Sequence, residues 1–143
     1  MRLMVDVLKP ENKANVSRPL TREAAVRANY ARIAAKKRER NDGWMAARRA
    51  LCMLPCDADG RVAFVPLGYR IIWPYSNKSW IPDADNVVAR VKNVMDGICL
   101  AFNMDDRSLE MLGVQRVKVT KDEREFDERR VYIVFDDLKG GEA

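Results

Sequence analysis

The most regular hydrophobic pattern in the chain lies between residues 86 and 102. Apolar residues recur there three and four positions apart, at Val87, Val91, Val94, Met95, Ile98 and Phe102. This spacing is typical of one face of an amphipathic helix, because about 3.6 residues make one turn. The sequence therefore predicts a helix with one buried face in the middle of the chain.

Other segments carry the patterns of strands. Residues 2–7 alternate apolar and polar positions, which predicts a short strand. Residues 69–73, 114–119 and 131–135 are further strand candidates. A charged segment separates the last two, and this arrangement favours an antiparallel hairpin between them.

A second helix is predicted to begin after Thr21, whose hydroxyl suits the N-cap position. It runs to about Lys37 or beyond, and Asn41-Asp42-Gly43 predicts a break. The elements thus alternate strand, helix, strand, helix, strand and strand. We expect one small α+β domain over residues 1–143, with a mixed sheet packed against helices. Its N-terminal part (1–55) is basic and helical, and the remainder (56–143) carries the candidate chemistry.

Carboxylates frame the central helix. Asp83 and Asp85 open it, and Asp105 and Asp106 follow its end. Aspartates crowded together repel one another unless a cation or a proton neutralises them, and oxygen ligands suit Mg²⁺ or Mn²⁺. Such an ion polarises a phosphodiester and activates water. The alternative is structural, because Pro-Asp-x-Asp-Asn before a helix is also typical of a turn and an N-cap.

A polar line is predicted along one face of this helix. At about 100° per residue, Lys92 and Asp96 each lie about 20° from Asp85 on the helical wheel. Arg90 points about 140° away from Asp85 and is a poor candidate for that line. Lys92 is therefore the cation best placed to contact a phosphate or its developing charge.

These residues resemble the signature of the RusA family of Holliday junction resolvases, metal-dependent endonucleases often encoded by phages and prophages. The signature is D-x-D-N, then a helix bearing a lysine and an aspartate, then D-D before a strand; the likeness covers roughly residues 64–138. It implies that Asp83, Asp85 and Asp106 bind the metal and that Asp96 lies beside it. Shorter family members have the lysine where this chain has Ala89, so Lys92, about one turn later, is assigned its role.

Charge is distributed unevenly. Residues 1–50 contain 13 Lys and Arg against 5 Asp and Glu, whereas the remainder contains 13 against 16. A basic half beside an acidic site suits a polyanion such as DNA. The candidate phosphate contacts on the first helix are Arg27, Arg32, Lys36, Lys37, Arg38, Arg40, Arg48 and Arg49, with Arg116 and Lys118 on a later strand. For any single one of them, a solvated surface position is the alternative.

Several other readings are disfavoured. The chain has no histidine and three cysteines, which argues against Ser/His or Cys/His nucleophiles, a zinc site and a disulfide framework; the cysteines are expected to be small core residues. Asp57-Ala58-Asp59-Gly60 is expected to be a turn, because Arg61 replaces the next calcium ligand.

Three aromatic residues near the candidate site have two possible roles. They either stack on unpaired bases or pack internally; they are Trp73, Tyr75 and Trp80. We expect a cytosolic protein without a transmembrane segment, signal peptide or nucleotide cofactor.

The expected function is that of a Mg²⁺-dependent endodeoxyribonuclease that resolves four-way junctions or other branched DNA in recombination and repair. The RusA resemblance also implies a homodimer, since paired cuts need two sites. Residues 2–7 and the late hairpin are candidate interfaces, because free strand edges invite pairing. Two alternatives stay open: a non-catalytic DNA-binding accessory protein of recombination, and a nuclease without junction preference.

Overall fold

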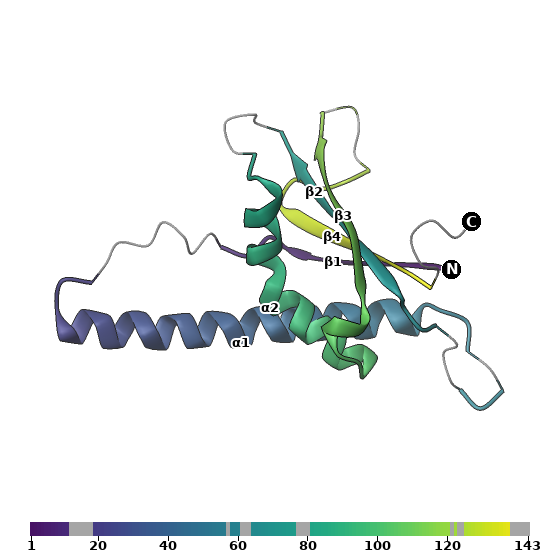
Figure 1. Cartoon of the computed structure of the whole chain (residues 1–143), viewed down its shortest axis with the longest axis horizontal. Helices are drawn as coiled ribbons and strands as arrows, with labels where there is room; N and C mark the ends of the chain where they lie inside the picture. The colour runs from purple at the N-terminus through teal and green to yellow at the C-terminus, as the bar shows by residue number, and fades with distance from the viewer. Residues whose placement is uncertain are drawn as a thin grey trace.

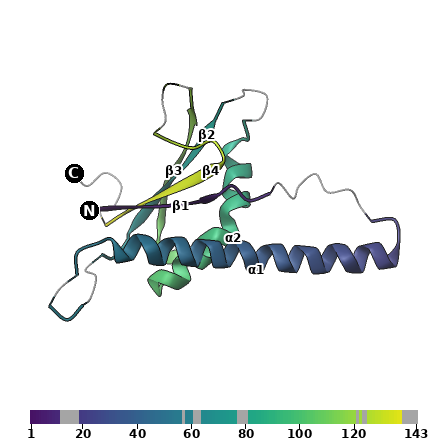
Figure 2. The same cartoon turned by 180° about the vertical axis from the view of Figure 1, so that it is seen from behind.

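The computed structural model describes residues 1–11, 19–56, 58–60, 64–76, 81–120, 122 and 125–137. They form one α+β domain with a mixed four-stranded sheet and two α-helices (Figures 1 and 2). The elements are β1 (Arg2–Leu8), α1 (Arg22–Cys52), β2 (Gly68–Tyr75), α2 (Ala84–Phe102), a 3-10 turn η2 (Asp106–Ser108), β3 (Glu110–Lys118) and β4 (Arg130–Asp136). The expected fold class and element order are therefore confirmed.

The sheet has the order β1-β4-β2-β3. β4 pairs antiparallel with both β1 and β2, whereas β2 and β3 are parallel and are joined through α2. The predicted hairpin between residues 114–119 and 131–135 is therefore wrong. β3 follows a helical crossover and lies at the edge, while the more apolar β4 takes a central position where it is covered on both sides by strands.

One face of the sheet carries the hydrophobic core. Val5, Ile133 and Ile71 lie side by side across β1, β4 and β2 and are at most 1% exposed. The apolar face of α2 belongs to the same cluster: five of its six predicted positions are buried and Phe102 is half-buried. From α1, Ala46 and Ala47 enter this core, but only from the C-terminal half of the helix.

The predicted break at Asn41-Asp42-Gly43 is wrong, since α1 continues for 31 residues from its confirmed N-cap, Thr21. Gly43 serves instead as the point where α1 meets α2. A Cβ atom there would overlap the Val94 carbonyl oxygen of α2, and a Cβ atom on Gly97 would overlap the Arg40 carbonyl oxygen of α1. The two glycines thus allow the helix backbones to approach closely.

The predicted turn at residues 57–60 and the predicted burial of the cysteines have different outcomes. Gly60 has a φ of +76°, as the predicted turn requires, while Asp57 and Arg61 lie outside the described residues. Among the cysteines, only Cys99 is a core residue; Cys52 and Cys56 are exposed, so the expectation for those two is wrong. Within the described residues, no helix has the length and apolar character needed to cross a membrane.

Candidate metal and nucleic-acid site

Asp83 and Asp85 lie at the N-terminal end of α2. Asp83 is the N-cap, and its carboxylate accepts a hydrogen bond of 3.0 Å from the backbone N–H of Asn86. Asp85 is exposed in the first turn. The structural reading of the D-x-D-N motif is therefore correct for Asp83, but capping uses one carboxylate oxygen and leaves the Asp85 side chain unused.

Arg116 of β3 lies at the same end. Its guanidinium donates a hydrogen bond of 3.3 Å to the carbonyl oxygen of Pro82, next to Asp83. Lys118 is two residues further along the same strand, and its side chain is exposed. The carboxylates at the start of α2 are therefore bordered by one predicted phosphate contact, Arg116.

Asp105 and Asp106 lie beyond the opposite end of α2. Asp105 caps η2, accepting a hydrogen bond of 3.1 Å from the backbone N–H of Arg107, and this bond lowers its pKa. A hydrogen bond with Asp105 is the main reason that the pKa of Asp106 is raised, and the Asp96 carboxylate contributes. The pair thus retains a proton more readily than an isolated aspartate, as crowded carboxylates do without a cation.

Asp96 and Cys99 connect this acidic end to the core. Burial, followed by the carboxylates of Asp106, Asp96 and Asp105, raises the pKa of the Cys99 thiol to about 11. Asp96 is half-buried and lies 3.9 Å from Arg40 of α1, beside the glycine crossing. One predicted phosphate contact is therefore already paired with a predicted site aspartate.

The two acidic groups are far apart within one chain. α2 has 19 residues, which at about 1.5 Å per residue make it on the order of 28 Å long, with Asp83 before its first residue and Asp106 after its last. The strands agree, because Arg116, near the end of β3, lies beside Pro82, whereas Glu110 at its start hydrogen-bonds to Leu67 before β2. Among the described residues, no three acidic, cysteine or histidine side chains form a metal-sized cluster.

The polar line along α2 has the predicted order. The helix includes Asp85, so the wheel geometry applies: Asp85 and Lys92 are exposed and Asp96 is half-buried. Arg90 lies elsewhere, with its guanidinium 4.7 Å from the centre of the Trp73 ring and donating two hydrogen bonds to the Pro10 carbonyl oxygen. Burial lowers the pKa of Arg90. The Arg90 side chain therefore packs against the body of the protein and does not belong to the polar line.

Trp73 is a core residue, being 2% exposed, with the Lys9 ammonium on its ring as well at 4.5 Å. Internal packing is therefore the correct reading for Trp73, while Tyr75 is half-buried and Trp80 lies outside the described residues. Sequence reasoning missed Lys9. The signal was weak, since a single lysine after a strand does not indicate an aromatic partner.

The basic residues of α1 lie mainly on a projecting arm. Within the described chain, no residue between 22 and 38 is buried, and the arm extends past the sheet in both views (Figures 1 and 2). The first ties to the body are the hydrogen bond from Asn93 to Glu39, 2.8 Å long, and the contact of Arg40 with Asp96. Arg32, Lys36, Lys37 and Arg38 are thus accessible to a polyanion from most directions.

Comparison with known proteins found no matching family model, curated protein or solved structure.

Proposed function

We propose that this protein is a Mg²⁺-dependent endodeoxyribonuclease of the RusA type that acts as a homodimer on branched DNA. The observation that carries the proposal is the division of the D-x-D-N and D-D motifs between opposite ends of one helix. Each end carries only part of the predicted set of carboxylates, and the exposed Lys92 lies between the two ends.

A second copy would complete the site. If two α2 helices lie antiparallel across a two-fold axis, Asp83 and Asp85 of one subunit approach Asp106 of the partner subunit. β3 is the interface that fits, because it is a free sheet edge and is joined to α2 by a short turn. The dimer then has two equivalent sites, as paired cutting of a four-way junction requires.

The donor set fits a hard divalent ion. It consists of carboxylate oxygens, and a cation there would favour the ionised form of Asp106, which the hydrogen bond with Asp105 disfavours by raising its pKa. Bound there, the ion would neutralise charge on the scissile phosphate and activate water. Asp83 and Asp85 of one subunit and Asp106 of the partner would hold it, with Asp96 nearby, and Lys92 would contact the phosphate.

DNA would be held by the basic arm of α1, with Arg116 and Lys118 beside the reacting phosphate. Fixed cations dock the backbone without reading the sequence, which suits recognition of a branched shape. The arm carries Arg32, Lys36, Lys37 and Arg38, none of which has an ion pair with another described residue.

Cleavage of a synthetic four-way junction tests this function. With Mg²⁺ or Mn²⁺ the protein should make two symmetrical cuts, and with a chelator it should bind the junction without cutting. Equal cutting of a linear duplex would favour the general nuclease instead. Binding without cutting under every metal condition would favour the accessory protein.

A further inference from the structure

The open edge of β1 faces a groove that none of the proposed chemistry uses. Two adjoining hollows, of about 280 and 270 Å³, run between β1 and the C-terminal half of α1 and share Asp6, Arg49 and Arg130. Residues 4–8 of β1 form one wall, which at about 3.3 Å per residue is some 16 Å long. The groove is therefore long enough for about five residues of extended chain.

The backbone of β1 turns half of its hydrogen-bonding groups toward this edge, and one of them, the Asp6 carbonyl oxygen, already accepts a hydrogen bond of 3.3 Å from Arg130. The register pairs Val5 with Ile133. Just outside β1, the Lys9 N–H donates to the Arg129 carbonyl and the Met1 carbonyl accepts from the Asp137 N–H, so the odd-numbered positions bond to the β4 side. Because bonded and non-bonded pairs alternate in an antiparallel ladder, Met4, Asp6 and Leu8 direct their amide groups outward. Such an edge is a template for one more strand.

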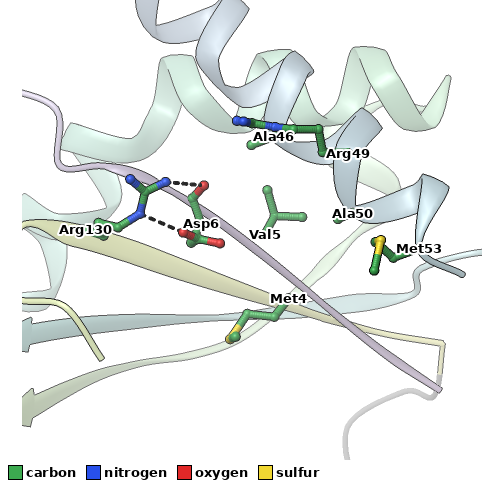
Figure 3. Close-up of a pocket in the computed structure, with 8 residues that line it drawn as sticks. All are labelled: Met4, Val5, Asp6, Ala46, Arg49, Ala50, Met53 and Arg130. Atoms are coloured by element: carbon green, nitrogen blue, oxygen red, sulfur yellow. Dashed lines mark hydrogen bonds and ion pairs between the residues drawn. The ribbon is translucent and has the colours of Figure 1, made fainter. Parts of the chain in front are cut away.

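The groove side chains specify what that strand should carry. Ala46, Ala50 and Met53 form an apolar end, and Arg49 lies beside them (Figure 3). Arg130 is neutralised by Asp6 at 2.6 Å, whereas Arg49 has no ion-pair partner among the described residues. The other carboxylate of the groove, Asp42, lines only the second hollow, so within the described chain the apolar end has Arg49 as its one unpaired charge. In an added strand every second side chain points toward α1, so the groove suits an apolar residue and a carboxylate two positions apart.

A second copy of β1 does not satisfy this pattern. Its helix-facing side chains would be Leu3, Val5 and Val7, which fill their own subunit's core and include no carboxylate. We therefore propose that β1 and α1 bind an extended acidic peptide segment of another protein, which adds to the sheet as a fifth strand and places a carboxylate on Arg49. This would tether the protein to a partner at a surface distinct from the arm and from α2.

The test is fluorescence polarisation of the whole 143-residue chain with two labelled probes, Ser-Thr-Leu-Thr-Asp-Thr-Ser and its reversed sequence, because either strand direction is allowed. At least one should bind, and the same peptide with lysine in place of aspartate should bind more weakly. Arg49→Glu should weaken binding of the aspartate peptide by about fivefold or more, because an ion pair is replaced by a repulsion. Arg38→Glu, the same charge change on the arm, is the matched control and should leave binding unchanged.

Met4→Pro removes an outward amide while keeping the bonds from β1 to β4, so it should abolish peptide binding with an unchanged circular dichroism spectrum. The proposal is overturned if neither aspartate probe binds at about 1 mM, the weak end of protein affinities. It is equally overturned if Arg38→Glu weakens binding as much as Arg49→Glu, or if folded Met4→Pro protein still binds the peptide.

Discussion

Gly43 of α1 and Gly97 of α2 face one another's helix backbone at the point where the two helices cross. A side chain on either glycine would overlap a carbonyl oxygen of the opposite helix, so both positions require the absence of a Cβ atom. The contact also places Arg40 near Asp96, 3.9 Å away, and thereby connects the basic arm to the acidic helix. The crossing is thus the joint between the two proposed functional surfaces.

Gly97→Ala should therefore destabilise the fold by at least about 3 kcal/mol, the upper part of the range for overpacked cores, because backbone atoms must move. Asp42→Ala, on an exposed position next to Gly43, is the control and should change stability by about 0.5 kcal/mol or less. Urea unfolding followed by circular dichroism measures both. Equal stability of Gly97→Ala and the natural chain would mean that the helices do not cross at these residues.

Lys92 and Arg90 should separate chemistry from packing. Lys92→Ala removes an exposed cation from the polar face of α2 and should reduce turnover by about 10²-fold with little change in stability. Arg90→Ala removes two hydrogen bonds to Pro10 and the stacking on Trp73, and should lower the free energy of unfolding by about 1–3 kcal/mol. Single-turnover cleavage and urea unfolding should be measured on both variants; the same reduction of turnover per folded molecule in both would contradict the assignment.

The arm of α1 should dominate the salt dependence of DNA binding. Replacing Lys36, Lys37 and Arg38 by alanine should reduce the magnitude of the slope of log K against log salt, by up to about 0.9 for each DNA phosphate that is no longer neutralised. Fluorescence anisotropy with a labelled junction gives the slope. If it changes with Arg116→Ala and Lys118→Ala but not with the triple variant, the DNA surface lies on β3 instead.

Cys99 should make the fold less stable at alkaline pH. Its thiol stays protonated in the folded chain up to a pKa of about 11, whereas in the unfolded chain it ionises near its ordinary value of 9.0. Ionisation therefore favours the unfolded state, and stability should fall as pH rises through this window. The decline should be smaller in Cys99→Ala, measured by urea unfolding at several pH values. Identical pH profiles would show that the thiol does not contribute.

Local patterns in the sequence were sufficient for much of the fold. Thr21 and Asp83 cap their helices because each side chain accepts a hydrogen bond from a backbone N–H three residues later. The apolar pattern of α2 could be predicted because its apolar side chains all face one core. The partners of β4 and the role of Gly43 depend on segments distant in sequence, which a local pattern does not contain. Exposure of Cys52 and Cys56 likewise follows from where α1 ends relative to the sheet.

For the candidate site, the sequence predicted which side chains share a face of α2 but not how far apart they lie. A helical wheel gives the angle of a side chain about the axis and discards its position along that axis. Asp85, Lys92 and Asp96 therefore share a face as predicted, yet Asp83 and Asp85 lie at the N-terminal end of the helix, whereas Asp106 follows its C-terminal end and lies near Asp96. That separation is the reason that the proposed site is shared between two subunits.

The most direct test of the shared site is complementation between two inactive variants, Asp83→Asn and Asp106→Asn. Each alone should bind junction DNA without cutting it, since an amide keeps the size of the carboxylate but loses the charge that holds the ion. In a mixed dimer, Asp83 of one subunit and Asp106 of the partner subunit form one intact site, while the other site lacks both. Unfolding and refolding the two variants together should thus restore nicking of a four-way junction, to about a quarter of the natural rate for random pairing by C₂ symmetry. No recovery from a mixture in which mixed dimers are demonstrated by mass spectrometry would contradict the shared site.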